Sequence, residues 1–379
     1  MPDTYITAKE IQQQPRLWRE TYEIIKHQKD KIEAFLDDMD KKRLRILLTG
    51  AGSSAYIGQS VKTYLNKSTA HFFEAMHTTD IVTHPKEIFT TKKPDVIVHY
   101  ARSGNSPESV ATFDFADQVL NDARHIILTC NAEGKLAQKA RDHDHALVIL
   151  MPKDANDKGL AMTGSFSTMV LASLLMFHTP DIIRYKSLVD WLYTSGEAIL
   201  KHEIYDQLES LDIHQAIYLG SYPFTGLTAE GALKMLELTS GAVSVLKESH
   251  LGFRHGPKSA LDEKTLVISF LSTDAYVRQY ELDLLKEISE NEDSPLVTLN
   301  PIKETALNEF SLYPVEITKP PLDFDEIFIS LPYLLFAQKL AYRYSLKLGI
   351  NPDNPSPSGQ INRVVQGVSI YPYDKDKGA

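Results

Sequence analysis

The stretch Ala101-Arg102-Ser103-Gly104-Asn105-Ser106-Pro107-Glu108-Ser109 decides the fold. It follows the apolar run Asp95–Tyr100, which is typical of a buried strand, and a helical pattern begins near Glu108. A strand that leads through a short Ser/Gly loop into a helix places hydroxyls and free backbone N–H groups at a helix N-terminus. Such an end favours anions, because the orphan amides and the helix dipole both attract negative charge.

A helix cap with a turn glycine is the simpler interpretation of this loop. Ser106 fits capping, since Pro107 would occupy the first helical position. Capping alone does not explain why Ser103, Gly104 and Ser106 all lie between a buried strand and a helix. Binding of an anion is the alternative that accounts for all three.

A second copy of the arrangement lies upstream, where strand Leu44–Thr49 leads into Gly50-Ala51-Gly52-Ser53-Ser54 and a helix. Two hydroxyl-rich loops at the ends of sister strands can converge on one phosphate, so a phosphorylated small molecule is the predicted ligand. The glycines also fit part of a dinucleotide fingerprint, with Ala55 at the third glycine position and Glu74 as a possible ribose ligand. The consecutive serines favour a phosphate monoester, and a nucleotide is the weaker alternative.

Composition limits the class of protein. The 379 residues suggest about two domains, and a hydrophobic share of 43% is ordinary for a globular chain. The formal net charge of −10 argues against nucleic acid or a membrane surface as partner. The start of the chain, Met1-Pro2-Asp3-Thr4, lacks a signal-peptide pattern, and the longest apolar tract, Phe166–Phe177, is shorter than the ~20 residues that span a bilayer. We therefore expect a cytoplasmic protein.

Alternation of strands, loops and helices predicts an α/β fold of parallel sheets covered by helices. Two similar units are expected: an N-terminal helical segment at 1–42, a first domain at 43–195, a helical connection at 196–212, and a second domain with its tail at 213–379. The predicted strands are Leu44–Thr49, His71–Ala75, Val96–Tyr100, Ile126–Thr129, Ala146–Leu150, Ala216–Leu219, Thr265–Leu271, Leu296–Leu299 and Leu312–Ile317, with strand-like composition again at Val364–Ile370. At the start, Thr7 and Glu10 have the spacing of a capping box.

In the second half, Glu230, Lys234 and Glu237 share one face of a predicted helix. On spacing alone a solvated ion-pair face is the favoured interpretation. The helix follows the loop Gly220–Thr225 at a strand end, however, where open α/β sheets bind ligands. A carboxylate with a lysine one turn away suits proton abstraction beside a cation.

Histidine and cysteine residues offer further candidates. His255 lies in the rigid turn Phe253-Arg254-His255-Gly256-Pro257 and is an acid–base candidate, although a lone histidine is usually structural. His143 and His145 have no further ligands nearby in the sequence, so we interpret them as surface residues and predict no metal site. The single cysteine, Cys130, excludes an intramolecular disulfide and is interpreted as buried and inert.

Together these motifs resemble the sugar isomerase (SIS) family of phosphosugar-binding domains, over nearly the whole chain from Leu44 to Ile370. The resemblance implies two tandem SIS domains, each a mostly parallel sheet flanked by helices in a flavodoxin-like three-layer sandwich. The chain is similar to the isomerase half of glucosamine-6-phosphate synthase. Within the family it most resembles the AgaS-type proteins, which are galactosamine-6-phosphate deaminases or tagatose-6-phosphate ketose/aldose isomerases.

The resemblance also implies roles for individual residues. The first loop matches the family's first phosphate loop and places Ser54 and Ser53 on the phosphate; the second places Ser103 and Ser106 there, with Arg102 and Gly104 supplying backbone. The helix Ala232–Glu237 matches the catalytic helix, which makes Glu237 the base, with Lys234 beside it. Arg254–Pro257 matches the turn whose histidine opens the sugar ring from the neighbouring subunit, which implies a homodimer with His255 contributed across the interface.

Two departures from the synthase stand out. A rough alignment puts Gln366 or Gly367 where the synthase keeps a lysine in its C-terminal loop, and Arg363 is the nearest cation. The glutaminase half and its nucleophilic cysteine have no counterpart here, which argues against glutamine-dependent synthesis.

The implied reaction converts D-galactosamine 6-phosphate to D-tagatose 6-phosphate and ammonia. His255 assists ring opening, Glu237 moves a proton from C2 to C1, and water converts the C2 imine to ketose and ammonia. The expected reaction classes are isomerase, deaminase and hydrolase, with no metal or redox cofactor. A ketose/aldose isomerase acting on tagatose 6-phosphate or another hexose 6-phosphate, and a non-catalytic phosphosugar-binding regulator, are the alternatives.

Overall fold

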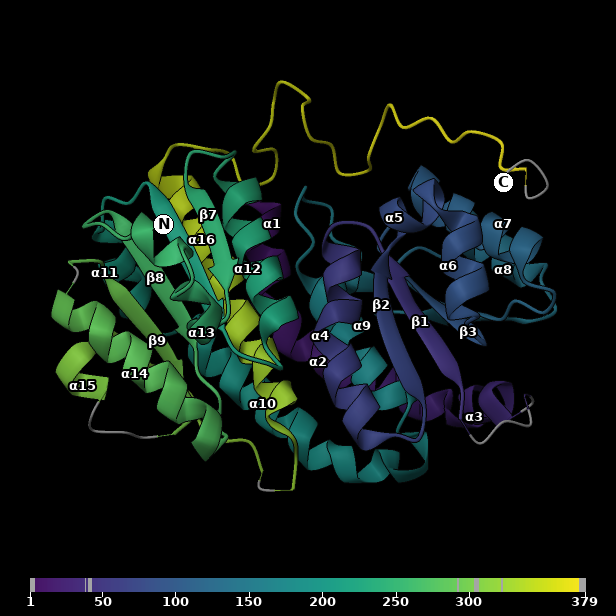
Figure 1. The fold of residues 1–379 in the computed structure, drawn as a ribbon, viewed down its shortest axis with the longest axis horizontal. Coiled ribbons are helices and arrows are strands. Elements are labelled where there is room, and N and C mark those ends of the chain that lie inside the picture. Colours follow the sequence, from purple (N-terminus) through teal and green to yellow (C-terminus); the bar gives the residue numbers. More distant parts are fainter. Residues whose placement is uncertain are drawn as a thin grey trace. The chain divides into compact units, whose positions relative to one another are not determined.

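Two five-stranded parallel sheets organise the chain (Figure 1). The structure is a computed structural model that describes residues 4–37, 39, 43–291, 293–302, 307–321 and 323–374. The start Met1-Pro2-Asp3, the predicted boundary at residue 42 and the end of the predicted tail at 375–379 lie outside these residues. The predicted α/β fold, with two parallel sheets flanked by helices, is confirmed.

The two sheets have the same strand order. The first runs β2-β1-β3-β4-β5 and the second β7-β6-β8-β9-β10, so each begins with a strand that pairs on both sides with the next two in sequence. The strands are β1 Arg45–Gly50, β2 Phe72–His77, β3 Val96–Ala101, β4 His125–Thr129, β5 Ala146–Leu150, β6 Gln215–Gly220, β7 Ser244–Glu248, β8 Thr265–Phe270, β9 Leu296–Asn300 and β10 Tyr313–Glu316.

Helices precede, connect and follow these strands. In the first half they are α1 Ile6–Gln12, α2 Gln14–His27, α3 Lys29–Asp37, α4 Ser53–Ser68, α5 Thr78–Thr83, α6 Pro85–Lys92, α7 Pro107–Val119, α8 Lys135–Arg141 and α9 Gly164–Met176, with short 3₁₀ turns η1 Lys153–Ala155 and η2 Thr179–Tyr185. In the second half they are α10 Lys186–Leu200, α11 Ile204–Ser210, α12 Thr225–Leu238, α13 His250–Phe253, α14 Ala275–Asn291, α15 Leu307–Phe310 and α16 Ser330–Lys347, with η3 Pro257–Ala260 and η4 Glu326–Ile329.

Alternating side chains of the first sheet pack on opposite faces, as strand geometry requires. Leu47 and Ile97 join an apolar cluster that includes Phe115 of α7. On the other face Leu48 meets α4, where a Cβ added at Gly58 would lie only 2.9 Å from the Leu48 Cβ. Glycine at this position lets helix and strand approach closely.

Sequence reasoning missed one strand and predicted one that does not form. Strand β7 is missing from the predicted set because Ser244–Glu248 has only two apolar residues, Val245 and Leu246, and so does not form the continuous apolar run by which the other strands were recognised. Val364–Ile370 pairs with no strand in the part of the chain that the structure describes, and most of this segment is exposed. Strand-like composition is therefore not sufficient to predict a strand when the segment has no strand beside it with which to pair.

The predicted capping box at the start of the chain is also wrong. Helix α1 begins at Ile6, and its first turn contacts a distant segment. The Thr7 hydroxyl donates to the Pro352 carbonyl at 3.1 Å and to Asp353 Oδ1 at 2.8 Å, and the Glu10 carboxylate accepts from the Gly159 amide at 3.3 Å. Contacts remote in sequence therefore replace the local ones that the spacing predicts.

The contacts divide the chain into two compact units. The unit around the first sheet contains Leu17–Asp157, Met162–Tyr185 and the tail from Ser358 onward, and the other contains the remaining described residues. The tail lies against the first sheet's helices, with the Tyr373 ring 5.4 Å from that of Phe115. The predicted domain limits at 43–195 and 213–379 stay a prediction.

No single helix in the described residues is both long and apolar enough to cross a membrane. By length and composition, the bent pair formed by α9 with the segment Thr179–Leu200 passes the same test. Every residue of α9 is buried inside the protein, as is usual for a core helix.

Candidate functional site

The loop after β1 is shaped by two glycines. Any Cβ at Gly50 would lie 2.6 Å from the Ser54 backbone carbon, so only glycine fits where the chain turns into α4. Gly52 precedes the helix with φ 55°, in the region where glycine is favoured. Ser53 and Ser54 then form the first turn of α4, and both are buried. Ser54 Oγ lies 3.6 Å from the Met162 sulfur.

The loop after β3 has the same organisation. Gly104 has φ 66°, and Ser106 precedes Pro107 at the first position of α7, as the sequence predicts. The Ser106 hydroxyl does not cap the helix but donates to Ser109 Oγ at 2.7 Å. The Ser103 hydroxyl accepts from the Asn105 amide at 3.3 Å, and the Ser103 carbonyl accepts from the Asn131 side chain at 2.9 Å. The loop is therefore held in place from several sides.

The two loops lie at the same edge of one sheet. Strands β1 and β3 pair in parallel, with Leu48 opposite Val98 and Thr49 opposite His99, so their carboxyl ends are neighbours. In the strand order 2-1-3-4-5, the connection after β1 and the connection after β3 run to opposite faces of the sheet. The position between two such strand ends is called the topological switch point, and open α/β sheets bind their ligands there. Two helix N-termini with serine hydroxyls meet there, which suits a phosphate group.

The C-terminal tail supplies a residue that sequence reasoning left without a place. Arg102 is buried, and its Nη2 donates to the carbonyl of Arg363 at 2.5 Å. The Arg363 guanidinium in turn donates to the Asp157 carbonyl and, at 2.8 Å, to Asn156 Oδ1. The second loop and the tail are thus tied together, so Arg363 lies beside the predicted phosphate loops. The sequence hinted at this arrangement only in that Arg363 is the cation nearest to the position at which the synthase keeps a lysine.

The corresponding edge of the second sheet already holds a carboxylate of the chain itself. After β8, Glu326 Oε2 accepts from the Ser272 hydroxyl at 2.7 Å, from the Thr273 amide at 2.6 Å and from the Thr273 hydroxyl at 3.0 Å. The Ser272 amide donates to Glu281 at 2.9 Å. These donors are therefore already used, and the first sheet is the better candidate for an external phosphate.

On helix α12, Lys234 lies between two glutamates. Its Nζ is 3.4 Å from Glu230 Oε1 and 2.5 Å from Glu237 Oε2. The side chains of Lys234 and Glu230 are fully buried, whereas that of Glu237 is 23% exposed. The alternative of a solvated ion-pair face is therefore wrong, because one lysine and one carboxylate are removed from water. The carboxylate of Glu237 keeps access to solvent.

The expectation that Glu237 lies at the ligand-binding end of a strand is not met. Helix α12 leaves the loop after β6 and runs for 14 residues, and Glu237 lies in its last turn. At a rise of 1.5 Å per residue this puts Glu237 ~18 Å from the start of the helix. The predicted proximity to Gly220–Thr225 holds for the beginning of α12 only.

His255 lies in the turn between α13 and η3, next to Gly256 with φ 124°. The side chain is exposed, and no hydrogen bond or ion pair of its ring occurs among the residues that the structure describes. Its neighbour Arg254 forms an ion pair with Glu287 of α14, as does Lys258. An exposed imidazole on a braced turn is available to a ligand or to a second chain.

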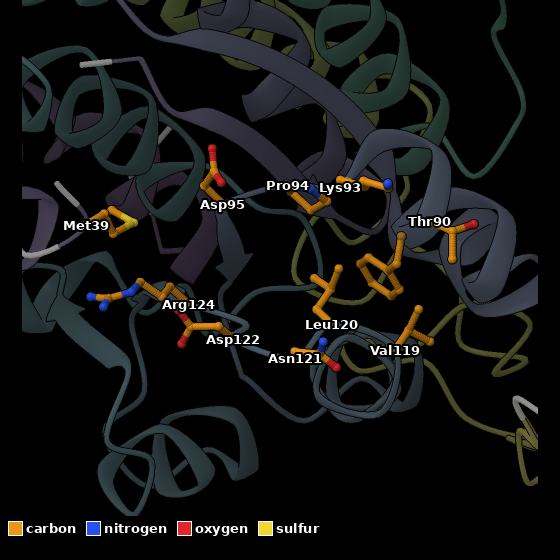
Figure 2. Close-up of a pocket in the computed structure, with 11 residues that line it drawn as sticks. Met39, Thr90, Lys93, Pro94, Asp95, Val119, Leu120, Asn121, Asp122 and Arg124 are labelled. Carbon is orange, nitrogen blue, oxygen red and sulfur yellow. The ribbon is translucent and has the colours of Figure 1, made fainter. Parts of the chain in front are cut away.

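A pocket of about 440 Å³ opens at the opposite edge of the first sheet (Figure 2). Its walls include Phe89 of α6, Pro94 and Asp95 before β3, and Leu120 after α7, together with Arg124 before β4. It therefore lies at the amino ends of the strands and contains none of the predicted site residues. Cys130 follows β4 at the carboxyl edge and is half-buried rather than fully buried as predicted; desolvation raises the pKa of its thiol, which keeps it protonated at neutral pH.

The fold and the two phosphate-type loops define the class. The SIS domain family matches residues 39–179. The chain is 39% identical over 376 residues to D-galactosamine-6-phosphate deaminase AgaS of Shewanella sp. (strain ANA-3), covering 97% of this chain and 92% of that protein. It is 37% identical over 378 residues to the protein of the same name from Escherichia coli, covering 97% and 96%. The crystal structure of tagatose-6-phosphate ketose/aldose isomerase from Escherichia coli superposes with a TM-score of 0.87 at 32% identity, covering 98% and 97%.

The chain therefore belongs to the AgaS family of SIS-domain proteins. The resemblance inferred from the two loops and the helix Ala232–Glu237 is confirmed. One expected reaction class is wrong: the relatives are named a deaminase and a ketose/aldose isomerase, and neither name is that of a hydrolase.

Proposed function

We propose that this chain is a deaminase/isomerase that converts D-galactosamine 6-phosphate to D-tagatose 6-phosphate and ammonia. The observation that carries the proposal is the 39% identity to a D-galactosamine-6-phosphate deaminase over 97% of the chain. The geometry supports it in two ways. The carboxyl ends of β1 and β3 form a sheet edge suited to binding an anion, and the partly exposed carboxylate of Glu237 forms an ion pair with the buried Lys234. We also propose that the two sheets are tandem SIS domains of three layers each; their common strand order supports this.

In this proposal the loops after β1 and β3 hold the substrate's phosphate. Ser53, Ser54, Ser103 and Ser106 contribute hydroxyls and amides, and Arg102 and Gly104 contribute backbone. Neighbouring strand ends and two helix N-termini favour this assignment. Fixing the phosphate holds the reacting carbons in place and turns binding energy into orientation.

Glu237 is the proposed base. It takes the proton from C2 of the open-chain amino aldehyde, giving an enolamine, and a proton is delivered to C1, giving an imine at C2. Water adds to the imine carbon and ammonia leaves, so the products are the ketose phosphate and ammonia. A positioned base supplies ~10²–10⁴-fold in such a step. Lys234, at 2.5 Å, holds the carboxylate in position.

His255 is the proposed acid–base group for ring opening, contributed by the second subunit of a homodimer. Its exposed ring without a hydrogen-bond partner among the described residues supports this role. We propose a cytoplasmic protein that binds neither nucleic acid nor membrane; the net charge of −10 favours this.

Ammonia release tests the proposal. The purified chain is incubated with galactosamine 6-phosphate and, in parallel, with glucosamine 6-phosphate and tagatose 6-phosphate. Ammonia from the galacto sugar supports the deaminase and its substrate. If no ammonia is released but tagatose 6-phosphate is interconverted with an aldose phosphate, the second candidate, a ketose/aldose isomerase, remains. The similarity to the solved tagatose-6-phosphate ketose/aldose isomerase favours this second candidate. No turnover of any sugar phosphate would leave a binding protein and refute both.

Glu237→Gln separates catalysis from binding. The variant should lose ~10²-fold or more in turnover while still binding galactosamine 6-phosphate in calorimetry. Glu290→Gln is the matched control, because among the described residues Glu290 forms only an exposed ion pair with Lys286, at 3.7 Å. Equal turnover in the two variants would remove Glu237 from the mechanism.

Mixing two inactive variants tests whether His255 acts across an interface. If the site combines Glu237 of one subunit with His255 of the other, each mixed dimer of Glu237→Gln and His255→Ala contains one intact site. Random mixing then restores about one quarter of wild-type turnover, because half the dimers are mixed and half their sites are intact. No restoration, with subunit exchange verified by tagged chains, would place His255 in its own subunit or outside the site.

A further inference from the structure

Three potential metal ligands from separate elements converge at the amino edge of the first sheet. Asp117 lies in the last turn of α7, His125 is the first residue of β4, and His143 lies in the turn between α8 and β5. One ligand atom of each lies within 4.8 Å of the others. Asp117 Oδ1 is 3.1 Å from His125 Nε2 and 3.4 Å from His143 Nε2.

We propose that Asp117, His125 and His143 bind a divalent metal ion of the zinc class. Two imidazole nitrogens and one carboxylate oxygen are a donor set that zinc accepts, with metal–ligand bonds of ~2.0–2.2 Å. Ligand atoms around a tetrahedral ion of that size are ~3.3 Å apart, which is close to the two measured separations. Three protein ligands leave the fourth position for water. This proposal is independent of the proposed function.

The surroundings fix His125 in an orientation suited to binding. Its side chain is fully buried, its ring stacks on Phe113 with centroids 3.9 Å apart, and its Nδ1 is 2.9 Å from His99 Nε2. A ligating histidine usually engages its second ring nitrogen in a hydrogen bond, which sets ring orientation and tautomer. His125 bound through Nε2 would carry its proton on Nδ1 and donate to His99.

His143 completes the set from the other side of Asp117. Its ring is perpendicular to that of His125, at 88° with centroids 5.3 Å apart, and it contacts Phe113 edge-on at 5.4 Å. The side chain is 24% exposed and that of Asp117 is 34% exposed, so an ion can enter from solvent. The ion would join the end of α7, the start of β4 and the turn before β5.

Without a metal, the same groups form a hydrogen-bonded cluster. His125 would then carry a proton on Nε2 and donate it to Asp117, so metal binding requires a change of tautomer in the pair His99–His125. His143 Nδ1 accepts from the His145 amide at 3.1 Å, so binding through Nε2, which leaves the proton on Nδ1, also breaks that hydrogen bond. The His99 Nδ1 atom, buried and without a hydrogen-bond partner among the described residues, would have to carry the displaced proton. This rearrangement of protons costs free energy, so the proposed site should bind the metal ion more weakly than a site whose ligands are already in the required protonation state.

Titration of the full-length chain with zinc and with cobalt tests the proposal. After treatment with a chelator, the protein should bind one zinc per chain in calorimetry, and cobalt should give the visible absorption of a four- or five-coordinate nitrogen/oxygen site. Thermal unfolding should shift upward with zinc. His143→Ala should lose the binding, the cobalt spectrum and the shift, and Asp117→Asn should weaken all three.

His145→Ala is the matched control. His145 lies two positions from His143, is 46% exposed and points to Asp122 at 3.6 Å, outside the cluster. It should bind like the wild type. Three results would each overturn the proposal: His143→Ala and His145→Ala both lose zinc binding equally, both retain it equally, or the wild type does not bind zinc stoichiometrically. Far-ultraviolet circular dichroism of His143→Ala verifies that the fold is intact, and if it is not, Asp117→Asn against His145→Ala decides.

Discussion

Replacement of Lys234 by methionine tests whether the cluster on α12 is a buried charge network. The ammonium is 3.4 Å from Glu230 and 2.5 Å from Glu237, and the side chains of Lys234 and Glu230 have no exposed surface. Methionine keeps most of the aliphatic volume but removes the cation. The buried Glu230 carboxylate then loses the ammonium that compensates its charge.

The expected loss follows from that burial. Removing one partner of a buried ion pair costs ~3–5 kcal/mol, because an uncompensated charge remains in the interior. Replacing both partners by neutral groups is close to neutral, so the double variant Glu230→Gln/Lys234→Met should regain all but ~1 kcal/mol. Lys286→Met, at the exposed pair with Glu290, should change stability by less than ~0.5 kcal/mol.

Urea unfolding of the four proteins at pH 7 measures these differences, and turnover of galactosamine 6-phosphate provides a second readout. The double variant should be stable but slow, by ~10²-fold, because the ammonium that holds Glu237 is missing. A loss in Lys234→Met no larger than in Lys286→Met would refute the buried network. A double variant as unstable as Lys234→Met would refute the role assigned to Glu230.

Three further outcomes are expected. Burial raises the pKa of Glu281 to about 7 from 4.5, so the folded state holds the proton more tightly and stability falls as pH rises between these values. Relative to Glu281→Gln, the wild type should lose ~3 kcal/mol between pH 4.5 and 7.5 in urea unfolding, and a constant difference would contradict this. Ser103→Ala should raise the KM for the sugar phosphate ~10-fold or more with a smaller change in kcat, and an unchanged KM would remove that loop from phosphate binding. Gly50→Ala should lower the free energy of unfolding by ~1–3 kcal/mol, because its Cβ would lie 2.6 Å from the Ser54 backbone; a thermal melt equal to that of the wild type would show that the turn can relax.

Much of the fold could be read from local patterns. Strand β5 has the predicted bounds Ala146–Leu150, and the loops after β1 and β3 lie where the Gly/Ser runs indicated. Buried parallel strands are continuous apolar runs, and turns demand particular residues, so these features are encoded within a few positions of the chain. The spacing of Glu230, Lys234 and Glu237 likewise fixed their common face, although not their burial.

Contacts between distant segments could not be predicted in this way. Glu326 binds Ser272 and Thr273, and the Arg363 carbonyl accepts from Arg102, across separations that carry no local signal. The cluster of Asp117, His125 and His143 is a further example, because these residues are 8 and 18 positions apart in the sequence and only the fold brings their ligand atoms within 4.8 Å of one another.

The sequence by itself determined the class of fold and the two loops at the strand ends, and it indicated the residues to which we assign the chemistry as a proposal. Periodicity and turn chemistry are properties of short segments, and they act wherever the segment lies. Only the tertiary structure decided which strand-end site is filled by the chain's own carboxylate, where the tail lies, and which side chains meet at the amino edge of the first sheet. Those outcomes depend on the packing of whole elements, because a side chain finds its partner only after the sheet has brought distant segments together.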